Sequence, residues 1–210
     1  MSTSVETPPP PSVEALDPPL WPLTLEMVEA MVENGILSEK EPVYLWKRRL
    51  ARRMAPQRPH ALTVGLVVEA LRKALPSGWH VEEEKPLVFR LSHSAPQPDI
   101  VILRGQLRDN TTRHPTTSGA ALVVEVADSS LKADRKMAAE YAAESVPAYW
   151  AAESVPAYWI VDIVNNRIET FAAPEQGASL QTATYERSGR VPLVIEGRLV
   201  AEIAVSGLLL

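Results

Sequence analysis

Two short apolar runs, each interrupted by a single acid, constrain the fold of this chain more than any other feature. They read Gln97-Pro98-Asp99-Ile100-Val101-Ile102-Leu103 and Ala121-Leu122-Val123-Val124-Glu125-Val126-Ala127. Runs of this length and composition are typical of buried strands. A carboxylate in such surroundings is strongly unfavourable unless it is paired, hydrogen-bonded or bound to a metal ion. Asp99 and Glu125 therefore indicate a divalent-metal site at the edge of a sheet.

The spacing of apolar residues along the chain predicts both helices and strands. Helices are expected at 24–34 and 60–75, and another from about Lys132 onward. Extended segments are expected at 43–54, 79–84, 86–91, 99–103, 121–127 and 158–164, with short strands within 182–210. Asn165-Asn166 predicts a hairpin turn that returns the chain along 167–171, and Gly189 and Gly197 mark further turns. The predicted fold class is α/β (mixed α+β): a mixed sheet flanked by helices, with additional hairpins toward the C-terminus.

The N-terminal residues differ in composition from the rest of the chain. Residues 1–22 are rich in Pro, Ser and Glu, with Pro8 to Pro11 consecutive, which predicts a disordered or polyproline-like tail before one domain at 23–210. The start lacks the basic and apolar regions of a secretory signal, and no apolar run approaches the roughly 18 residues of a membrane span. The chain has no cysteine, so a disulfide framework or a Cys-based zinc site is excluded and we expect a cytoplasmic protein.

A perfect tandem repeat interrupts the second half of the chain. The sequence AAESVPAYW occupies residues 142–150 and again 151–159. A solenoid needs longer units and at least three of them, so a slip in the gene or an assembly error explains the repeat better than a functional insertion. Pro147 and Pro156 discourage helix just before them. We therefore expect one copy to form a loop or an extra helical turn and the other to join helix to strand.

A basic cluster stands out against the net charge of −5. A dedicated DNA-binding domain is usually basic, but a local patch can steer a nucleic acid on its own. The cluster comprises Lys47, Arg48, Arg49, Arg52 and Arg53, with Arg58 nearby. Contact with backbone phosphates is one interpretation, and a solvated, charged edge strand that resists aggregation is the other.

Several motifs together resemble the Uma2 family, formerly DUF820. They are PDIVILRG, LVVEVADSSLKADRK, YAAESVPAYW and YWIVDIVNNRIETF, together with Pro59-His60, Gly78-Trp79-His80-Val81 and Val191-Pro192-Leu193-Val194. The resemblance runs from about Leu23 to Leu210. It implies an endonuclease with the restriction-endonuclease-like fold of the PD-(D/E)xK superfamily.

The resemblance also implies roles for particular residues. Asp99 matches the first metal-binding acid and Glu125 the second. The usual lysine two residues later is absent, because position 127 is Ala, and Lys136 after Asp134-Arg135 is the candidate for its role. Tyr44 stands where the family commonly has Glu near the start of the domain, and Glu84 is the candidate substitute.

The cofactor and the partner follow from the same resemblance. It implies Mg²⁺ (or Mn²⁺) held by Asp99, Glu125 and Glu84, and nucleic acid as the partner, with DNA favoured. Magnesium held by one or two carboxylates activates water and neutralises charge on the phosphate. No membrane partner is expected, and a homodimer is compatible with the fold.

Each residue also has a structural interpretation. Asp99 after Pro98 is able to cap a turn, and Glu125 to pair with a Lys or Arg. Lys136 is also readily explained as a solvated helix residue, His60 as a satisfied structural histidine, and Asp162 as the edge of a strand.

Three functions are therefore open. Asp99 and Glu125 favour a metal-dependent endonuclease. Tyr44 and the displaced Lys136 favour a catalytically degenerate nuclease-fold protein that binds nucleic acid or a protein partner. The acidic net charge favours a structural or interaction protein whose Pro-rich tail is the ligand segment.

Overall fold

The computed structural model describes most of the predicted domain and neither the tail nor the tandem repeat in full. The described residues are 21–38, 40–53, 55–90, 93–111, 113–128, 156–172 and 181–210. Most of the predicted tail, the helix predicted from Lys132, Lys136 itself, the first copy of the repeat and most of the second lie outside these residues. Within them, the predicted mixed sheet, helices and C-terminal hairpins are confirmed.

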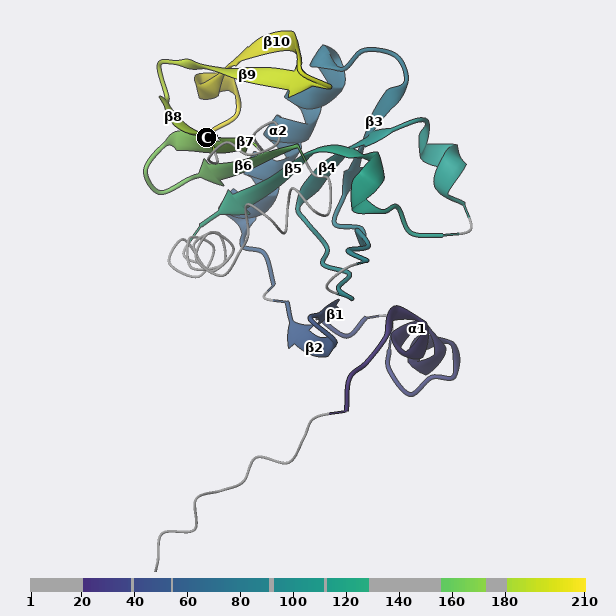
Figure 1. Cartoon of the computed structure of the whole chain (residues 1–210). Coiled ribbons are helices and arrows are strands. Elements are labelled where there is room, and N and C mark those ends of the chain that lie inside the picture. Colours follow the sequence, from purple (N-terminus) through teal and green to yellow (C-terminus); the bar gives the residue numbers. More distant parts are fainter. Residues whose placement is uncertain are drawn as a thin grey trace, which may run out of the picture.

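A six-stranded mixed sheet forms the centre of the molecule (Figure 1). Its strands lie in the order β3 (Trp79–Glu83), β4 (Ile100–Arg104), β5 (Ala120–Ala127), β6 (Ala157–Asp162), β7 (Arg167–Ala172) and β8 (Gln181–Glu186). All neighbours are antiparallel except β5 and β6, which are parallel. Both central strands are buried on two faces, which explains why β4 and β5 read as continuous apolar runs rather than alternating ones.

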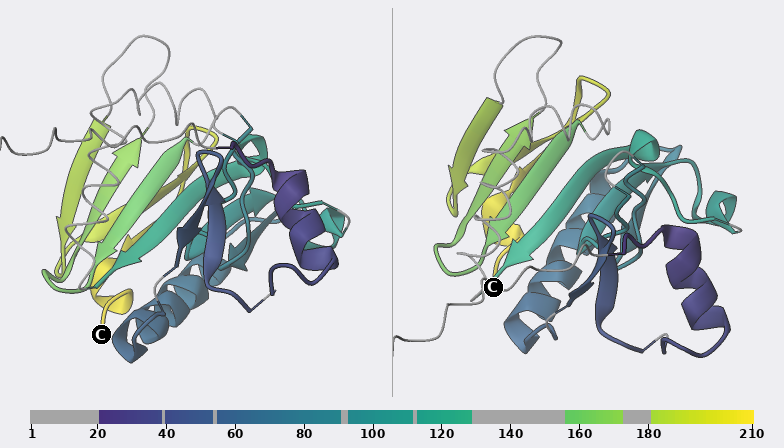
Figure 2. Two further views of the ribbon diagram at one scale, coloured as in Figure 1. Left: turned by 90° about the horizontal axis from the view of Figure 1, so that it is seen from below. Right: turned by 60° about the horizontal axis from the view of Figure 1, so that its bottom comes forward.

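One face of the sheet is covered by α2 (Arg58–Ala74) and by the β9–β10 hairpin (Arg190–Ile195 and Arg198–Ala204), as Figure 2 shows. The helix buries Val64, Val67, Val68 and Leu71, which recur at helical spacing. These side chains pack against alternate residues of the strands, including Ile100, Ile102, Leu122, Val124 and Val126. A short 3-10 turn at 205–207 follows β10, and Leu208 and Leu209 complete this core.

The opposite face is covered near β4 and β5 by the segment that joins β3 to β4. Leu87 and Phe89 of this segment are buried against Val101, Leu103 and Val123. We predicted a strand at 86–91, and that prediction is wrong: Val88 and Phe89 make only isolated bridges, to Thr116 and Ser94. The apolar residues cover the sheet instead of joining it, so they show the composition of a strand without its ladder. Other short 3-10 turns occupy 107–110 and 117–119 in the polar loop before β5.

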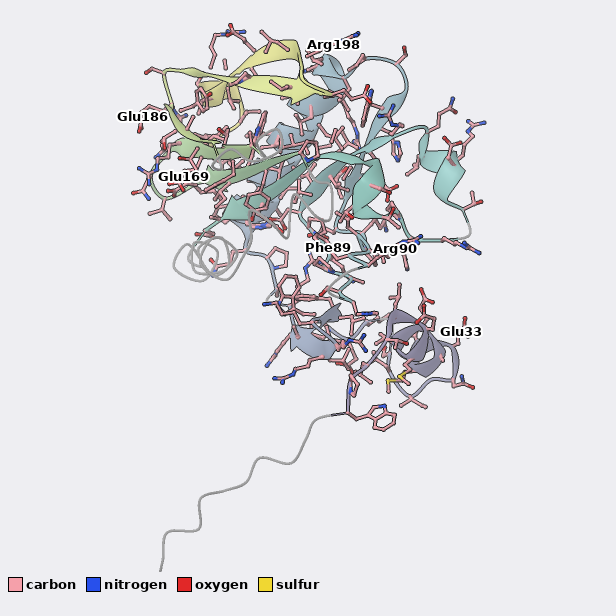
Figure 3. The ribbon with its side chains drawn as sticks, viewed as in Figure 1. Glu33, Phe89, Arg90, Glu169, Glu186 and Arg198 are labelled. Carbon is pink, nitrogen blue, oxygen red and sulfur yellow. The ribbon has the colours of Figure 1, made fainter. Side chains whose placement is uncertain are left out.

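A small unit formed by α1 (Leu25–Glu33) and the β1–β2 hairpin (Val43–Trp46 and Arg49–Arg52) lies below the sheet in Figure 1. Thr24 caps α1 by accepting a hydrogen bond from the Met27 amide. The hairpin contacts the segment before β4 through a bridge between Leu45 and Ala95. Figure 3 labels Phe89 and Arg90, which lie on the chain between the sheet and this hairpin. The basic hairpin is thereby attached to the segment that leads into Asp99.

Candidate active site

The register of β4 and β5 brings Asp99 and Glu125 together. Ile100 pairs with Val124, so the next residues outward are Asp99 and Glu125, on the same face of the sheet. The two acids then hydrogen-bond reciprocally with the backbone. The Asp99 amide donates to Glu125 Oε2 at 3.2 Å, and the Val126 amide donates to Asp99 Oδ2 at 2.8 Å. Asp99 is 8% exposed and Glu125 is half-buried, so both carboxylates are partly withdrawn from water.

His60 contacts the same carboxylate. It lies in the first turn of α2, directly after Pro59, and its Nε2 is 3.1 Å from Asp99 Oδ2. The His60 side chain is 14% exposed. The hydrogen bond to Asp99 is the main cause of a raised His60 pKa, and burial opposes it. Our interpretation of His60 as a structural histidine missed this contact, since nothing in the sequence indicates which strand end faces the start of the helix.

Glu84 lies on the other side of Asp99. Glu83 pairs with Ile100 across β3 and β4, and Glu84 follows with a left-handed backbone (φ 51°). Its amide donates to the Asp99 carbonyl at 3.2 Å. The Glu84 carboxylate forms an ion pair with Arg53 at 2.6 Å, and Arg53 also donates to Gln97 Oε1 at 3.3 Å. Glu84 thus directly follows β3, Asp99 directly precedes β4 and Glu125 lies within β5, with Arg53 paired to Glu84.

The basic cluster falls into two groups. Lys47, Arg49 and Arg52 are exposed and Arg48 is half-buried; none of these four makes an ion pair with any residue the structure describes. Arg53 is paired with Glu84 and lies nearest to the acids. Four cations of the β1–β2 hairpin are therefore available to an anionic partner, while the fifth is engaged by the site itself.

Two groups that the family resemblance implies for such a site, an acid near position 44 and a lysine, are not found in its described part. Tyr44 brings no acid: its ring meets that of Trp46 edge-on, with centroids 6.5 Å apart. Lys136 lies outside the described residues. Among the residues described, no group of three or more His, Cys, Asp or Glu is placed to hold a metal ion. Two carboxylates are nevertheless a donor set that fits Mg²⁺, because this ion is usually bound by one or two carboxylates and keeps several waters.

Asp162, the other buried acid of the sheet, belongs to a turn. It is fully buried at the end of β6 and accepts hydrogen bonds from the backbone amide and the side chain of Asn165, at 3.0 and 2.7 Å. Arg167 Nε lies 3.3 Å from its carboxylate. These contacts satisfy the charge locally and fix the β6–β7 turn, in keeping with its interpretation as a strand edge.

Comparisons with known proteins identify the family and the fold of the chain. The model of the Uma2 family, described as "Putative restriction endonuclease", matches residues 43–203. A crystal structure of a protein described as a putative nuclease belonging to DUF820, from Anabaena variabilis ATCC 29413, superposes with a TM-score of 0.63. The alignment covers 89% of this chain and 97% of the other at 12% identity, which shows a shared fold. A search of curated proteins found no match. No helix in the described part of the chain is long and apolar enough to cross a membrane.

Proposed function

The chain belongs to the Uma2 family, and from that membership we propose that it is a metal-dependent endonuclease that hydrolyses phosphodiester bonds of nucleic acid, with DNA as the favoured substrate. One observation carries the proposal: Asp99 and Glu125, 26 residues apart, lie at facing positions of the β4–β5 register, and the carboxylate of each accepts a backbone amide hydrogen bond from the other acid's segment. Two neighbouring carboxylates at the ends of buried strands are a donor set of the kind that binds Mg²⁺, which usually takes one or two carboxylates and keeps several waters. A shared cation would compensate both charges.

We propose that Asp99 and Glu125 hold Mg²⁺ or Mn²⁺, with Glu84 as a third acid in place of the one missing at Tyr44. When bound, such an ion polarises a phosphoryl oxygen and activates a water molecule. Glu84 is supported by its position next to Asp99. Its carboxylate forms an ion pair with Arg53 at 2.6 Å, so Glu84 would have to leave this pair to join the other two acids on the ion.

The cations of the site would contact the substrate. Lys47, Arg48, Arg49 and Arg52 have no carboxylate partner among the described residues, and we propose that they contact backbone phosphates. Such contacts position a nucleic acid without reading its sequence. Arg53 directly follows these residues in the chain and contacts Glu84, so we propose that it would meet a phosphate close to the acids. For Lys136, we propose the role of orienting the attacking water and stabilising the transition state electrostatically.

A catalytically degenerate nuclease-fold protein that binds nucleic acid or a protein is the second candidate. Tyr44 favours it, because the acid that the family commonly carries there is replaced by an aromatic ring that packs on Trp46. The cytoplasmic location and the homodimer expected from the sequence remain proposals, and light scattering after size-exclusion chromatography tests the latter.

A cleavage assay separates the two candidates. Purified protein is incubated with plasmid DNA, single-stranded DNA and RNA, each with Mg²⁺, Mn²⁺ or EDTA. Asp99→Asn and Glu125→Gln preserve the shapes of the acids, and Glu83→Gln is the matched control, because Glu83 is an acid of β3 that pairs with Arg72 instead of facing the site. We expect cleavage that requires the metal, falls to background in the first two variants and survives in the control.

Two results would contradict the proposal. Cleavage that persists in Asp99→Asn excludes the assigned site. Binding of nucleic acid without metal-dependent cleavage of any of the three substrates favours the degenerate protein over the endonuclease.

A further inference from the structure

The two hydrogen bonds to the Asp99 carboxylate fall on the same oxygen. The Val126 amide donates to Oδ2 at 2.8 Å, and His60 Nε2 lies 3.1 Å from that atom. No described residue hydrogen-bonds to the other oxygen, Oδ1. A carboxylate held at one oxygen by two donors from different directions has a fixed orientation, so Oδ1 is presented in one direction.

His60 is itself held in place by the fold. It belongs to the first turn of α2, whose apolar face is part of the main core. Because α2 is anchored in this way, its first turn stays at a fixed distance from Asp99, which directly precedes β4. Val126 is equally constrained, since it lies inside the β5–β6 pairing. The two donors to Asp99 Oδ2 therefore come from two different packed elements, α2 and β5.

A comparison with His80 separates a structural histidine from His60. His80 Nδ1 lies 3.0 Å from the Gly105 carbonyl and Nε2 lies 3.1 Å from Glu82 Oε1, so each of its ring nitrogens has a polar partner within hydrogen-bond distance. His60 Nδ1 is buried and has no hydrogen-bond partner among the described residues. A buried polar atom without a partner is unfavourable. The contact between His60 Nε2 and Asp99 is therefore kept although it leaves Nδ1 buried without a partner, an energetic cost that a purely structural histidine would avoid.

We propose that His60 is a positioning residue that holds Asp99 Oδ2 so that Oδ1 is directed at the divalent cation, an inference that rests on the proposed function of the site. A histidine donates to a carboxylate only through a protonated nitrogen, so Nε2 carries the hydrogen and neutral His60 has a bare Nδ1. Partners of this kind typically change metal affinity by roughly 10- to 100-fold when they are removed. The residue acts through Asp99 and not on the substrate.

Three variants test this role through the binding of Mn²⁺ alone, without nucleic acid. His60→Leu removes the donor and keeps a similar volume. His60→Gln places an amide nitrogen near the position of Nε2 and restores the donor. His80→Leu is the matched control, because His80 is buried to the same degree and also contacts a carboxylate. Mn²⁺ affinity is measured by electron paramagnetic resonance and calorimetry, and the melting temperature of each variant is recorded in parallel.

We expect His60→Leu to weaken Mn²⁺ binding by about 10-fold or more and His60→Gln to stay within a few-fold of the natural protein. His80→Leu should lower the melting temperature and leave Mn²⁺ affinity unchanged. A folded His60→Leu protein with unaltered affinity overturns the inference, and so does a His60→Gln protein as weak as His60→Leu. If His60→Leu does not fold, His60→Asn replaces it, because its shorter amide reaches only the Nδ1 position.

Failure of the proposed function gives a different result. If the natural protein does not bind Mn²⁺, or if Asp99→Asn binds it equally well, the metal site is wrong and the role of His60 is excluded with it. If Asp99→Asn abolishes binding while His60→Leu does not alter it, the metal site stands and only the positioning role is wrong.

Discussion

The turn of the β1–β2 hairpin should be more stable with glycine at position 48. Trp46 pairs with Arg49, so the loop has only Lys47 and Arg48, and both have left-handed backbones (φ 44° and 64°). Turns of this type favour Asn-Gly. The β9–β10 hairpin follows that preference at its second position, where Gly197 has φ 73°. Arg48 therefore occupies a place that glycine fills in the equivalent turn of the same protein.

The size of the effect follows from the backbone. A left-handed conformation costs about 1–2 kcal/mol for a residue with a side chain, and glycine avoids this cost. Glycine also loses more backbone entropy on folding, which cancels roughly 0.5–1 kcal/mol of that gain. Arg48→Gly should therefore raise the free energy of unfolding by about 0.5–1 kcal/mol. That corresponds to a rise of about 1–4 °C in the melting temperature for a domain of this size. The backbone bonds of Arg48 to His93 and Leu23 do not depend on its side chain.

The same Arg48→Gly substitution should lower the affinity for nucleic acid while it raises the stability. Loss of one phosphate contact lowers affinity and reduces the slope of log K against log salt by about 0.9 for duplex DNA. Fluorescence anisotropy with a labelled duplex over a salt series measures this slope, and urea unfolding measures stability. Arg49→Gln is the control, since it removes a charge from an exposed strand position and should alter binding alone. A less stable Arg48→Gly protein refutes the backbone reasoning; an unchanged salt slope refutes the phosphate contact.

Three further substitutions test the packing. Gly105→Ala should destabilise the protein by about 1–3 kcal/mol, because the new methyl would lie 2.6 Å from Asp109 Oδ2 at a residue with φ +94°. Gly65→Ala, in α2 with nothing within 4 Å of the new methyl, should instead stabilise it by up to about 1 kcal/mol; urea unfolding that gives both changes the same sign contradicts these assignments. Asp162→Ala should cost about 3 kcal/mol, because the Asn165 amide and Arg167 Nε lose their buried carboxylate, although Arg167 keeps its second ion pair with Glu169. A melting temperature that stays within 2 °C, on the order of a 1 kcal/mol change, would show that Asp162 does not hold the turn.

The sequence predicted the elements well where periodicity and turn residues agree. The helices at 24–34 and 60–75 are confirmed within two residues. The strand at 86–91 was wrong because the chain buries Leu87 and Phe89 as a cover on the sheet, and composition does not distinguish a covering segment from a hydrogen-bonded one.

The site was predictable only in part for a similar reason. Asp99 and Glu125 were identified from burial of charge, a local property. Their pairing depends on the register between β4 and β5, and the contact of His60 depends on where α2 packs. Both are set by contacts between residues far apart in the sequence, and a single sequence carries no direct record of them.

The reciprocal bonds between the two acids decide which variants are informative. Asp99→Ala would remove a metal ligand, but it would also leave the Val126 amide and His60 Nε2 without their acceptor. An unpaired buried donor costs about 1–3 kcal/mol, so lost activity in the alanine variant would not distinguish a missing ligand from a disturbed β5. Asp99→Asn is the cleaner change, because its amide oxygen still accepts both hydrogen bonds while the charge is gone. Retained stability together with lost Mn²⁺ binding in this variant assigns the effect to the carboxylate charge itself.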